Sequence, residues 1–562
     1  MAQTQPYGFA CQGGLDVNKS SFNLQETAGV ATQLLNFEVN GDGGYRRING
    51  CEKVTNETNS KIDAGGIYSD TIRGITGYSD GAVVSSGNRI FFTINGNDWL
   101  DISSHSHNHT DGDPYATYIT QTGLLTTTTK NSQFAIYEGT SSRGELIMFN
   151  ENNTPQFIKI TGASTDITTL TYLRKSITVG ASLKPATGIT HRNRLIVAAD
   201  PTTPNTVYYS DLITGDFDFT GGTSGSVDLE DKVVGIKSFR DTVIVFCKSS
   251  IHRIVNIGDA TNQAVEVVSK NIGCVNRNTI QELGGDLIFL AQDGLRNLAG
   301  TDKIDDTELG TVSRPIQKLL TSKLLKQHQL FNISSIVIKS KNQYRLFYSP
   351  KLFSGESDEA KRADIKDSKG FTATLTSNGL EFSEILGMQC TAIGSILNEQ
   401  NQEQIYHGDR HGSILRHDTG NSFFTYGNLE NIRAIYQTPY LDFGDMGTQK
   451  TLNYINVKMD PEGIVRASLG VKFGEENYTP VQPAEIVLPQ LTLGSPFGLA
   501  KFFDSSDPQS TTFSFGAVDA PLVRQAVQGS GNTIQVRILS DDQNASYNIQ
   551  GIYINYYPSG RR

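Results

Sequence analysis

The histidine-rich segment at residues 105–109 has the residue types and spacing that most directly suggest a chemical role. His105, His107 and His109 alternate with Ser106 and Asn108. In an extended segment, residues two apart lie on the same side, so the three imidazoles could converge on one metal ion. The surrounding sequence is wholly polar, which is typical of an exposed loop, and we favour that interpretation. We therefore expect no metal or other cofactor, with the three histidines as the alternative site.

Several carboxylates could support acid–base chemistry. Paired carboxylates serve as general acid and base in glycosidases, and propeller folds host such enzymes. Carboxylates in polar loops are more commonly turn-forming residues, which is what we expect here. The chain contains no nucleophile-elbow, zinc-protease, phosphate-loop or dinucleotide-binding motif, so we predict that it is not an enzyme. The carboxylates considered are Asp200, Asp216, Asp218, Asp305 and Asp306.

Two adjacent arginines, Arg46 and Arg47, follow a glycine-rich turn at residues 41–44. Guanidinium groups bind phosphate well, so a phosphate site is one interpretation. We favour the other, in which the two arginines pack or form salt bridges that fix the N-terminal strand.

The five cysteines are far apart in the sequence and odd in number. No Cys-x-x-Cys pair and no Cys/His ligand spacing links them. We expect free thiols in a chain that is assembled in a reducing cytoplasm. They are Cys11, Cys51, Cys247, Cys274 and Cys390.

The composition restricts the class of protein. The chain has 562 residues, 48 basic and 58 acidic side chains and a net charge of −10, with 55 glycines and 9% aromatic residues. An acidic chain does not wrap nucleic acid by charge attraction. No segment approaches the roughly 18 apolar residues of a membrane span, and the N-terminus does not resemble a secretory signal. Short strands joined by polar turns best explain these numbers.

The strand pattern predicts an all-β fold. From about residue 61 to 430, short apolar strands such as residues 242–247 (TVIVFC) alternate with Gly and Asn turns and with more polar strands. A strand that is apolar throughout is buried on both faces, as the inner strands of propeller blades are. We predict an irregular β-propeller of about five to seven blades. A stack of β-sandwiches with similar strands is the alternative.

Three further segments complete the expected organisation. Residues 1–60 read as an N-terminal extended arm and hairpin, and residues 431–562 as a C-terminal β-sandwich with period-two alternation. One short helix is expected over residues 313–325, with Ser313 as N-cap and Pro315 just inside.

Several segments together resemble the tail nozzle and DNA-stabilisation proteins of short-tailed, cyanophage-like bacteriophages. They run discontinuously from near the N-terminus to the end of the chain. They are residues 37–39 (FEV) with 43–50 (GGYRRING), 293–296 (DGLR), 305–306 (DD), 313–316 (SRPI), 438–439 (TP) with 442–444 (DFG), and 560–562 (GRR).

The resemblance implies a structural protein of the phage virion. Such proteins form a β-propeller ring, a homo-hexamer, in the tail, with an adaptor and fibres as partners. The ring retains the packaged genome and provides the channel for its ejection. Its contact with double-stranded DNA is transient and not sequence-specific, which an acidic wall would favour. The implied location is the virion tail, after assembly in the host cytoplasm and without membrane insertion.

The alternative function is a receptor-binding, fibre-attachment or baseplate protein that recognises host surface polysaccharide. The Tyr- and polar-rich segment at residues 115–118, with Tyr115 and Tyr118, could then contact sugars.

Overall fold

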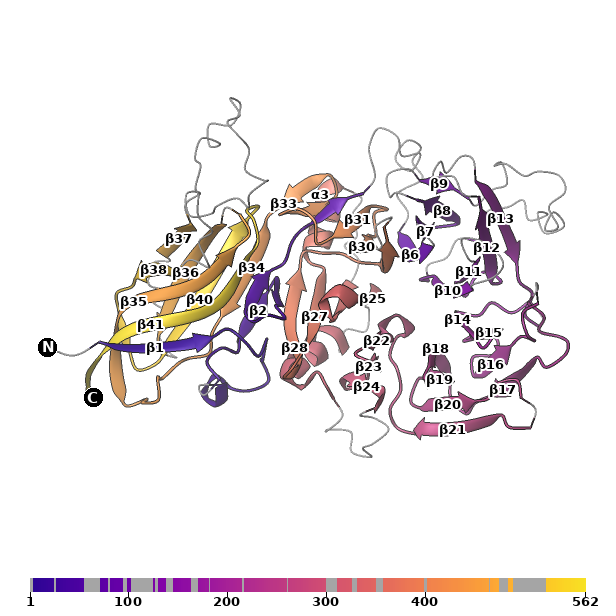
Figure 1. Cartoon of the computed structure of the whole chain (residues 1–562), viewed down its shortest axis with the longest axis horizontal. Helices are drawn as coiled ribbons and strands as arrows, with labels where there is room; N and C mark the ends of the chain where they lie inside the picture. Colours follow the sequence, from indigo (N-terminus) through magenta and orange to yellow (C-terminus); the bar gives the residue numbers. More distant parts are fainter. Residues whose placement is uncertain are drawn as a thin grey trace, which may run out of the picture.

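The computed structural model is mostly β-strand and has two parts, a propeller and a sandwich, that lie side by side (Figure 1). The predicted all-β class, with an irregular β-propeller and an added C-terminal β-sandwich, is confirmed. The structure describes residues 4–24, 27–54, 71–78, 81–94, 99–102, 125–126, 130–137, 145–162, 170–180, 182–214, 217–259, 261–299, 311–325, 331–349, 357–398, 402–463, 465–474, 484–488 and 522–561.

Six separate sheets are blades of the propeller. The first four blades have four strands each: β6 (Ile72–Tyr78), β7 (Gly81–Ser86), β8 (Arg89–Thr93), β9 (Leu100–Asp101); β10 (Gln133–Tyr137), β11 (Glu145–Phe149), β12 (Gln156–Thr161), β13 (Thr171–Ser176); β14 (Thr187–His191), β15 (Arg194–Ala198), β16 (Thr206–Tyr209), β17 (Gly225–Asp228); and β18 (Val233–Phe239), β19 (Thr242–Cys247), β20 (Ile251–Val255), β21 (Ala264–Ser269). The other two are β22 (Gln281–Leu283), β23 (Asp286–Ala291), β24 (Gly294–Asn297); and β29 (Ala392–Leu397), β30 (Glu403–Gly408), β31 (Ile414–His417), β5 (Cys51–Lys53), β32 (Phe423–Thr425), β33 (Asn428–Glu430).

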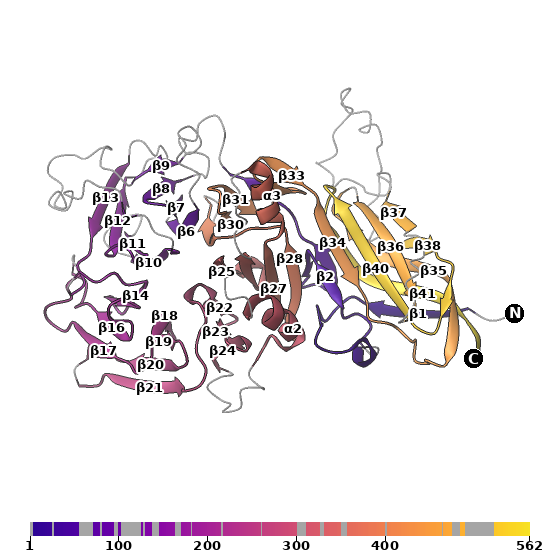
Figure 2. The same cartoon turned by 180° about the vertical axis from the view of Figure 1, so that it is seen from behind.

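A nine-stranded sheet closes the ring and continues beyond it. Its first four strands stand in the ring between the sheets that begin with β22 and with β29, and its other five strands belong to the sandwich (Figures 1 and 2). Propeller and sandwich therefore share one hydrogen-bonded sheet. In order it runs β25 (Phe331–Ile338), β26 (Gln343–Ser349), β27 (Lys369–Thr376), β28 (Gly379–Leu386), β2 (Gln33–Leu35), β34 (Ile432–Gln437), β40 (Ile534–Asp542), β36 (Val465–Phe473), β37 (Ala484–Leu488).

A seven-stranded sheet forms the other layer of the sandwich. Apolar residues of both layers, such as Val536 of β40 and Ile552 of β41, belong to one buried core. The strands alternate buried and exposed residues, as the period-two pattern predicts. The sheet consists of β3 (Phe37–Val39), β4 (Tyr45–Arg47), β41 (Tyr547–Arg561), β35 (Thr448–Pro461) and β38 (Leu522–Ala526), with β1 (Gln5–Ala10) beside β41 and β39 (Ser530–Gly531) beside β35.

The first fifty-odd residues are distributed over both parts. β1, β3 and β4 extend the seven-stranded sheet, β2 lies in the shared sheet, and β5 pairs with β31 of the last blade. The segment expected as an N-terminal arm and hairpin does contain the β3–β4 hairpin. Its strands join propeller and sandwich rather than extend away from them.

The apolar strands pack on both faces, as expected for inner strands of blades. In β19, Val243 and Val245 belong to the core shared with β15, while Ile244 and Phe246 belong to the core shared with β23. Burial of alternate side chains against two neighbouring blades explains why the strand carries no polar residue in its middle.

The helix expected at residues 313–325 is present in the form of three short turns, η5 (Arg314–Ile316), α2 (Gln317–Leu319) and the π-helical η6 (Leu320–Leu325). Ser313 does not cap it: its hydroxyl accepts the Leu295 backbone N–H instead. A second helix, α3 (Asp358–Lys366), was not expected, although Ser357 caps it through the Ala360 N–H. Single turns are η1 (Ser21–Leu24), η4 (Arg277–Thr279) and η7 (Lys339–Lys341). In the part of the chain that the structure describes, no helix has the length and apolarity of a membrane span.

Candidate functional site

Several candidates from the sequence lie outside the described residues. They are His105, His107, His109, Tyr115, Tyr118, Asp216, Asp305 and Asp306.

Asp200 and Asp218 stabilise their own turns. Asp200 is buried, and it accepts hydrogen bonds from the backbone N–H groups of Lys184 and Thr202 at 2.5 and 2.8 Å. Burial alone would raise the pKa of Asp200, but the hydrogen bonds from Thr202 and the backbone lower it. Asp218 accepts from the backbone N–H and the hydroxyl of Thr220 at 2.7 and 2.8 Å. The turn-forming interpretation is therefore confirmed for these two carboxylates.

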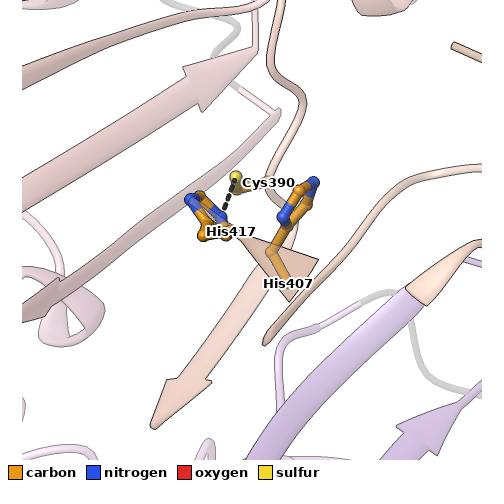
Figure 3. Close-up of side chains that lie close together, drawn as sticks. All are labelled: Cys390, His407 and His417. Carbon is orange, nitrogen blue, oxygen red and sulfur yellow. Dashed lines mark hydrogen bonds between the residues drawn. The ribbon is translucent and has the colours of Figure 1, made fainter. Parts of the chain in front are cut away.

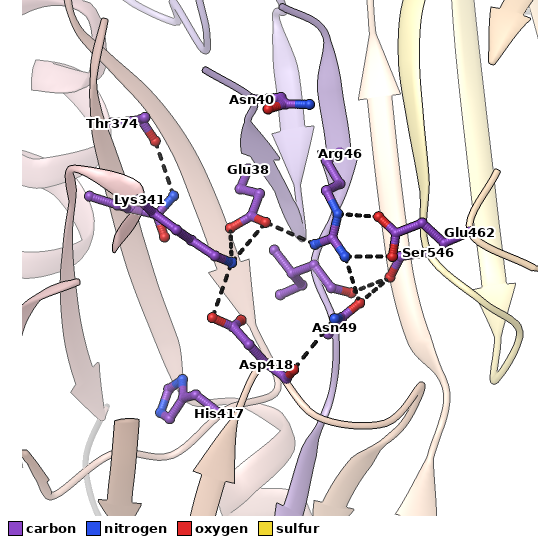
Figure 4. Close-up of polar contacts among 12 residues, drawn as sticks. Glu38, Asn40, Arg46, Asn49, Lys341, Thr374, His417, Asp418, Glu462 and Ser546 are labelled. Carbon is purple, nitrogen blue, oxygen red and sulfur yellow. Dashed lines mark hydrogen bonds and ion pairs between the residues drawn. The ribbon is translucent and has the colours of Figure 1, made fainter. Parts of the chain in front are cut away.

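Arg46 and Arg47 form ion pairs within the protein, which confirms the salt-bridge interpretation. Arg46 contacts Glu462 at 2.5 Å and Glu38 at 2.9 Å (Figure 4). Arg47 is 1% exposed and contacts Asp542 at 2.9 Å. The contacts with Glu462 and Asp542 hold the β3–β4 hairpin to the C-terminal strands of the sandwich.

The same hairpin is tied to the propeller through a buried ionic network, which Figure 4 shows in part. Glu38 accepts from Lys341 at 3.0 Å and from Arg345 at 3.2 Å. Both cations also reach Asp418, which follows β31 of the last blade, at 3.1 Å. Burial opposes ionisation of Asp418, but Arg345 and Lys341 outweigh it and hold the pKa of that carboxyl well below its usual range. The network therefore joins the sandwich, the shared sheet and the last blade.

The central cavity of the propeller is small and polar. It has a volume of about 230 Å³ and is lined by the innermost strands of the ring, including β6, β14 and β25. Amide side chains make hydrogen bonds in it: Gln133 of β10 donates to Asn278, which precedes β22 on the other side of the ring, at 3.2 Å. Gln281 of β22 donates to the Ser335 carbonyl of the neighbouring strand β25 at 2.9 Å. A cavity of this size has room for several water molecules and is smaller than most ligand pockets.

A cluster of three potential metal ligands lies between the last blade and the shared sheet. One ligand atom from each of Cys390, His407 and His417 lies within 4.8 Å of the others, and all three residues are buried (Figure 3). Cys390 Sγ is 3.8 Å from His417 Nε2. His407 Nδ1 is buried and has no hydrogen-bond partner among the described residues.

The strand register explains how the two histidines meet. His407 of β30 lies opposite Leu415 of β31, and His417 is two residues further along the same strand. Side chains two apart share a face of the sheet, so both imidazoles point to the same side. Cys390 precedes β29 and belongs to the core on that side, together with Leu415. No recognised Cys/His spacing in the sequence indicated this cluster, although the turn at residues 408–413 predicts the hairpin that brings the histidines together.

Burial keeps all three groups uncharged at neutral pH. Desolvation lowers the pKa of His407 to about 3 and lowers that of His417 well below its usual range. It raises the pKa of the Cys390 thiol well above its usual value, and the nearby Cys51 thiol adds to that effect. Neutral imidazole is the form of histidine that binds metal ions, whereas the thiol must first lose its proton.

The low pKa of His407 predicts that stability falls on acidification. His407 takes up a proton near pH 6.5 in the unfolded chain, but only near pH 3 in the folded chain. In a buffer that contains a metal chelator, we expect the free energy of unfolding to fall by about 2 kcal/mol from pH 7 to pH 5 because of His407 alone. Urea unfolding at a series of pH values measures this. His407→Gln should flatten that part of the profile, and an unchanged slope in this variant would contradict the assignment.

The fold and these sites define a β-propeller joined to a β-sandwich through a shared sheet. No model of a known protein family matches the chain, and no curated protein matches it. Among solved structures, BamB from Moraxella catarrhalis is similar with 10% identity and a TM-score of 0.30, over 62% of this chain and 84% of that chain. The extracellular domain of the putative one-component system BT4673 from B. thetaiotaomicron is similar with 10% identity and a TM-score of 0.35, over 78% of this chain and 48% of that chain. These values are too low to extend either protein's role to this chain.

Proposed function

We propose that this chain is a structural subunit of a bacteriophage tail, in which copies of it assemble into a ring-shaped nozzle. The ring, which we expect to be a hexamer, retains the packaged genome and opens the path for its ejection. In this proposal an adaptor protein lies on one side of the ring, and fibres attach to the ring. The chain has no catalytic role in this proposal.

The observation that carries the proposal is the rigid joint between propeller and sandwich. The nine-stranded sheet runs through both parts, and the network around Glu38, Arg345 and Asp418 is buried across the same boundary. The residues that resemble nozzle proteins, 37–39 and 43–50, supply Glu38, Arg46 and Arg47 to this joint. A subunit that bears the pressure of packaged DNA needs such stiffness, because independently moving domains would let the ring deform.

The DNA path in this proposal runs between copies of the chain. The central cavity of the propeller, at about 230 Å³ and crossed by amide hydrogen bonds, has no room for a duplex. The net charge of −10 would let an inter-subunit channel guide the phosphate backbone without binding it.

The test is the mass and symmetry of the purified full chain, alone and with its tail partners. We expect sixfold rings by native mass spectrometry and negative-stain imaging, and a density at the tail axis in cryo-electron microscopy of the virion. We also expect no retention of double-stranded DNA in a gel-shift assay at physiological salt. A location away from the tail axis, with no contact to the channel, would contradict the nozzle.

One observation favours the alternative function, recognition of host polysaccharide. A shallow hollow of about 480 Å³ on the seven-stranded sheet is lined by two tyrosines, two asparagines and a lysine, together with Pro6 and Ile554, and Tyr553 in it is 48% exposed. Aromatic faces and amides are the groups that bind sugars. Saturable binding to a glycan array, together with a threefold or monomeric state, would favour this function over the nozzle. Its aromatic, amide and lysine side chains are those of Tyr454, Asn456, Lys458, Tyr553 and Asn555.

A further inference from the structure

We propose that Cys390, His407 and His417 form a structural binding site for a divalent metal ion of the zinc class. The site would tie the segment before β29 to strands β30 and β31, inside the last blade of the ring. It does not depend on the phage role, and it would apply equally to a propeller with another function.

The geometry of the cluster is close to that of a metal site. A tetrahedral zinc ion with bond lengths of about 2.3 Å to sulfur and 2.0–2.1 Å to nitrogen places those ligand atoms about 3.5 Å apart. The Cys390 Sγ to His417 Nε2 distance is 3.8 Å, and all three ligand atoms lie within 4.8 Å of one another. Shifts of about 1 Å or less would therefore complete the coordination.

An unpartnered buried nitrogen supports the same conclusion. His407 is 1% exposed, and its Nδ1 has no hydrogen-bond partner in the described part of the chain. A buried polar atom without a partner costs roughly 1–3 kcal/mol, so such atoms are rare in folded proteins. A metal ion bound to the imidazole would remove that cost.

The donor set selects the class of metal. One thiolate and two neutral imidazoles are the ligands of zinc and of its spectroscopic substitute cobalt, whereas calcium and magnesium take oxygen ligands. The fourth position would be filled by water, as in other zinc sites with three protein ligands.

Metal binding requires two proton movements. Arg345 donates to Nδ1 of His417 at 3.3 Å, so the neutral ring carries its proton on Nε2, facing the sulfur. On binding, that proton moves to Nδ1 and the Cys390 thiol releases its proton to solvent, so one proton leaves for each ion bound. Arg345 then loses its hydrogen bond to the His417 imidazole but keeps four others, to Gln343, Glu38 and Asp418. The negative charge of Asp418 also acts on the His417 ring and partly offsets the positive charge of Arg345 there.

The experiment measures the metal content of the full chain purified from cells grown in zinc-supplemented medium, because a site this buried would be filled during folding. Inductively coupled plasma mass spectrometry should find about one zinc ion per chain. Growth in cobalt should give the near-ultraviolet thiolate-to-cobalt absorption band. Cys390→Ser and His407→Gln should each retain less than about a tenth of the metal, because even loss of a second-shell partner weakens binding by about 10–100-fold.

Cys274→Ser is the matched control. Cys274 is as buried as Cys390, with 1% exposure, and lies in a different core between two other blades. This variant should keep the full metal content and the cobalt band. Equal metal content in Cys390→Ser and in the unmodified chain would overturn the proposal, as would an unmodified chain that holds neither zinc nor a cobalt–thiolate band. The measurement on the unmodified chain does not depend on whether a variant folds. If that chain holds no metal, the three side chains only pack in the core.

Discussion

Replacing Arg345 with methionine is expected to lower the free energy of unfolding by about 3–5 kcal/mol. The guanidinium is 1% exposed, whereas the two other cations that contact Glu38, Arg46 and Lys341, are partly exposed. Its removal leaves Glu38, which is 4% exposed, with less compensation, and Asp418 loses the cation that contributes most to its low pKa. Buried charge that loses part of its compensation is among the larger single sources of destabilisation.

Arg416→Met is the matched control for Arg345→Met. Arg416 lies on β31, close in sequence to Asp418, but its pair with Glu52 is 3.9 Å long and both side chains are exposed. Exposed pairs contribute about 0–1 kcal/mol, so this variant should unfold at nearly the same urea concentration as the unmodified chain. Equal shifts for both variants in urea-unfolding curves would mean that the network does not hold the joint together.

The strand pattern predicted the fold because it depends on local sequence. An apolar run such as residues 242–247 indicates burial on both faces wherever its neighbours lie, and β19 does pack against blades on both sides. The period-two strands of the C-terminal region predicted the sandwich for the same reason. The shared nine-stranded sheet was not predicted, because pairing of β28 with β2 joins residues about 350 positions apart, and no local pattern records a partner at that distance.

The missed helix and the missed cluster have different explanations. Ser357 followed by Asp358 and Glu359 is a readable helix start, but α3 has only a narrow apolar face, with Ile365 buried, so helical periodicity was weak. Cys390 meets His407 and His417 only after three elements have packed, and their spacing matches no metal motif. Conversely, Arg46 and Arg47 were assigned correctly because an adjacent pair of cations in an acidic chain has many available carboxylates.

Replacing Asn36 with alanine should destabilise the joint between propeller and sandwich by about 3–5 kcal/mol. Asn36 is the single residue between β2 of the shared sheet and β3 of the other sandwich layer. Its amide nitrogen donates to the carbonyls of Leu386 and Arg433 at 3.1 and 2.9 Å, and its oxygen accepts from the Leu386 N–H at 2.9 Å. The side chain thus bridges β28 of the propeller and β34 of the sandwich, and alanine would remove three hydrogen bonds from partly buried backbone groups.

Backbone strain must be separated from these hydrogen bonds, because Asn36 has a φ of 53°, in the left-handed region. Asn342 has a similar φ of 46°, but it lies in a turn after η7. Asn342→Ala therefore measures the strain alone, about 1–2 kcal/mol. Asn36→Gly makes the complementary test, since glycine accepts the backbone conformation and still loses the side-chain bridge. If the bridge holds the joint, Asn36→Gly should remain clearly less stable than Asn342→Ala in urea unfolding, and hydrogen exchange at Leu386 should accelerate. If Asn36→Gly were as stable as the unmodified chain, the continuous sheet alone would hold the propeller and the sandwich together.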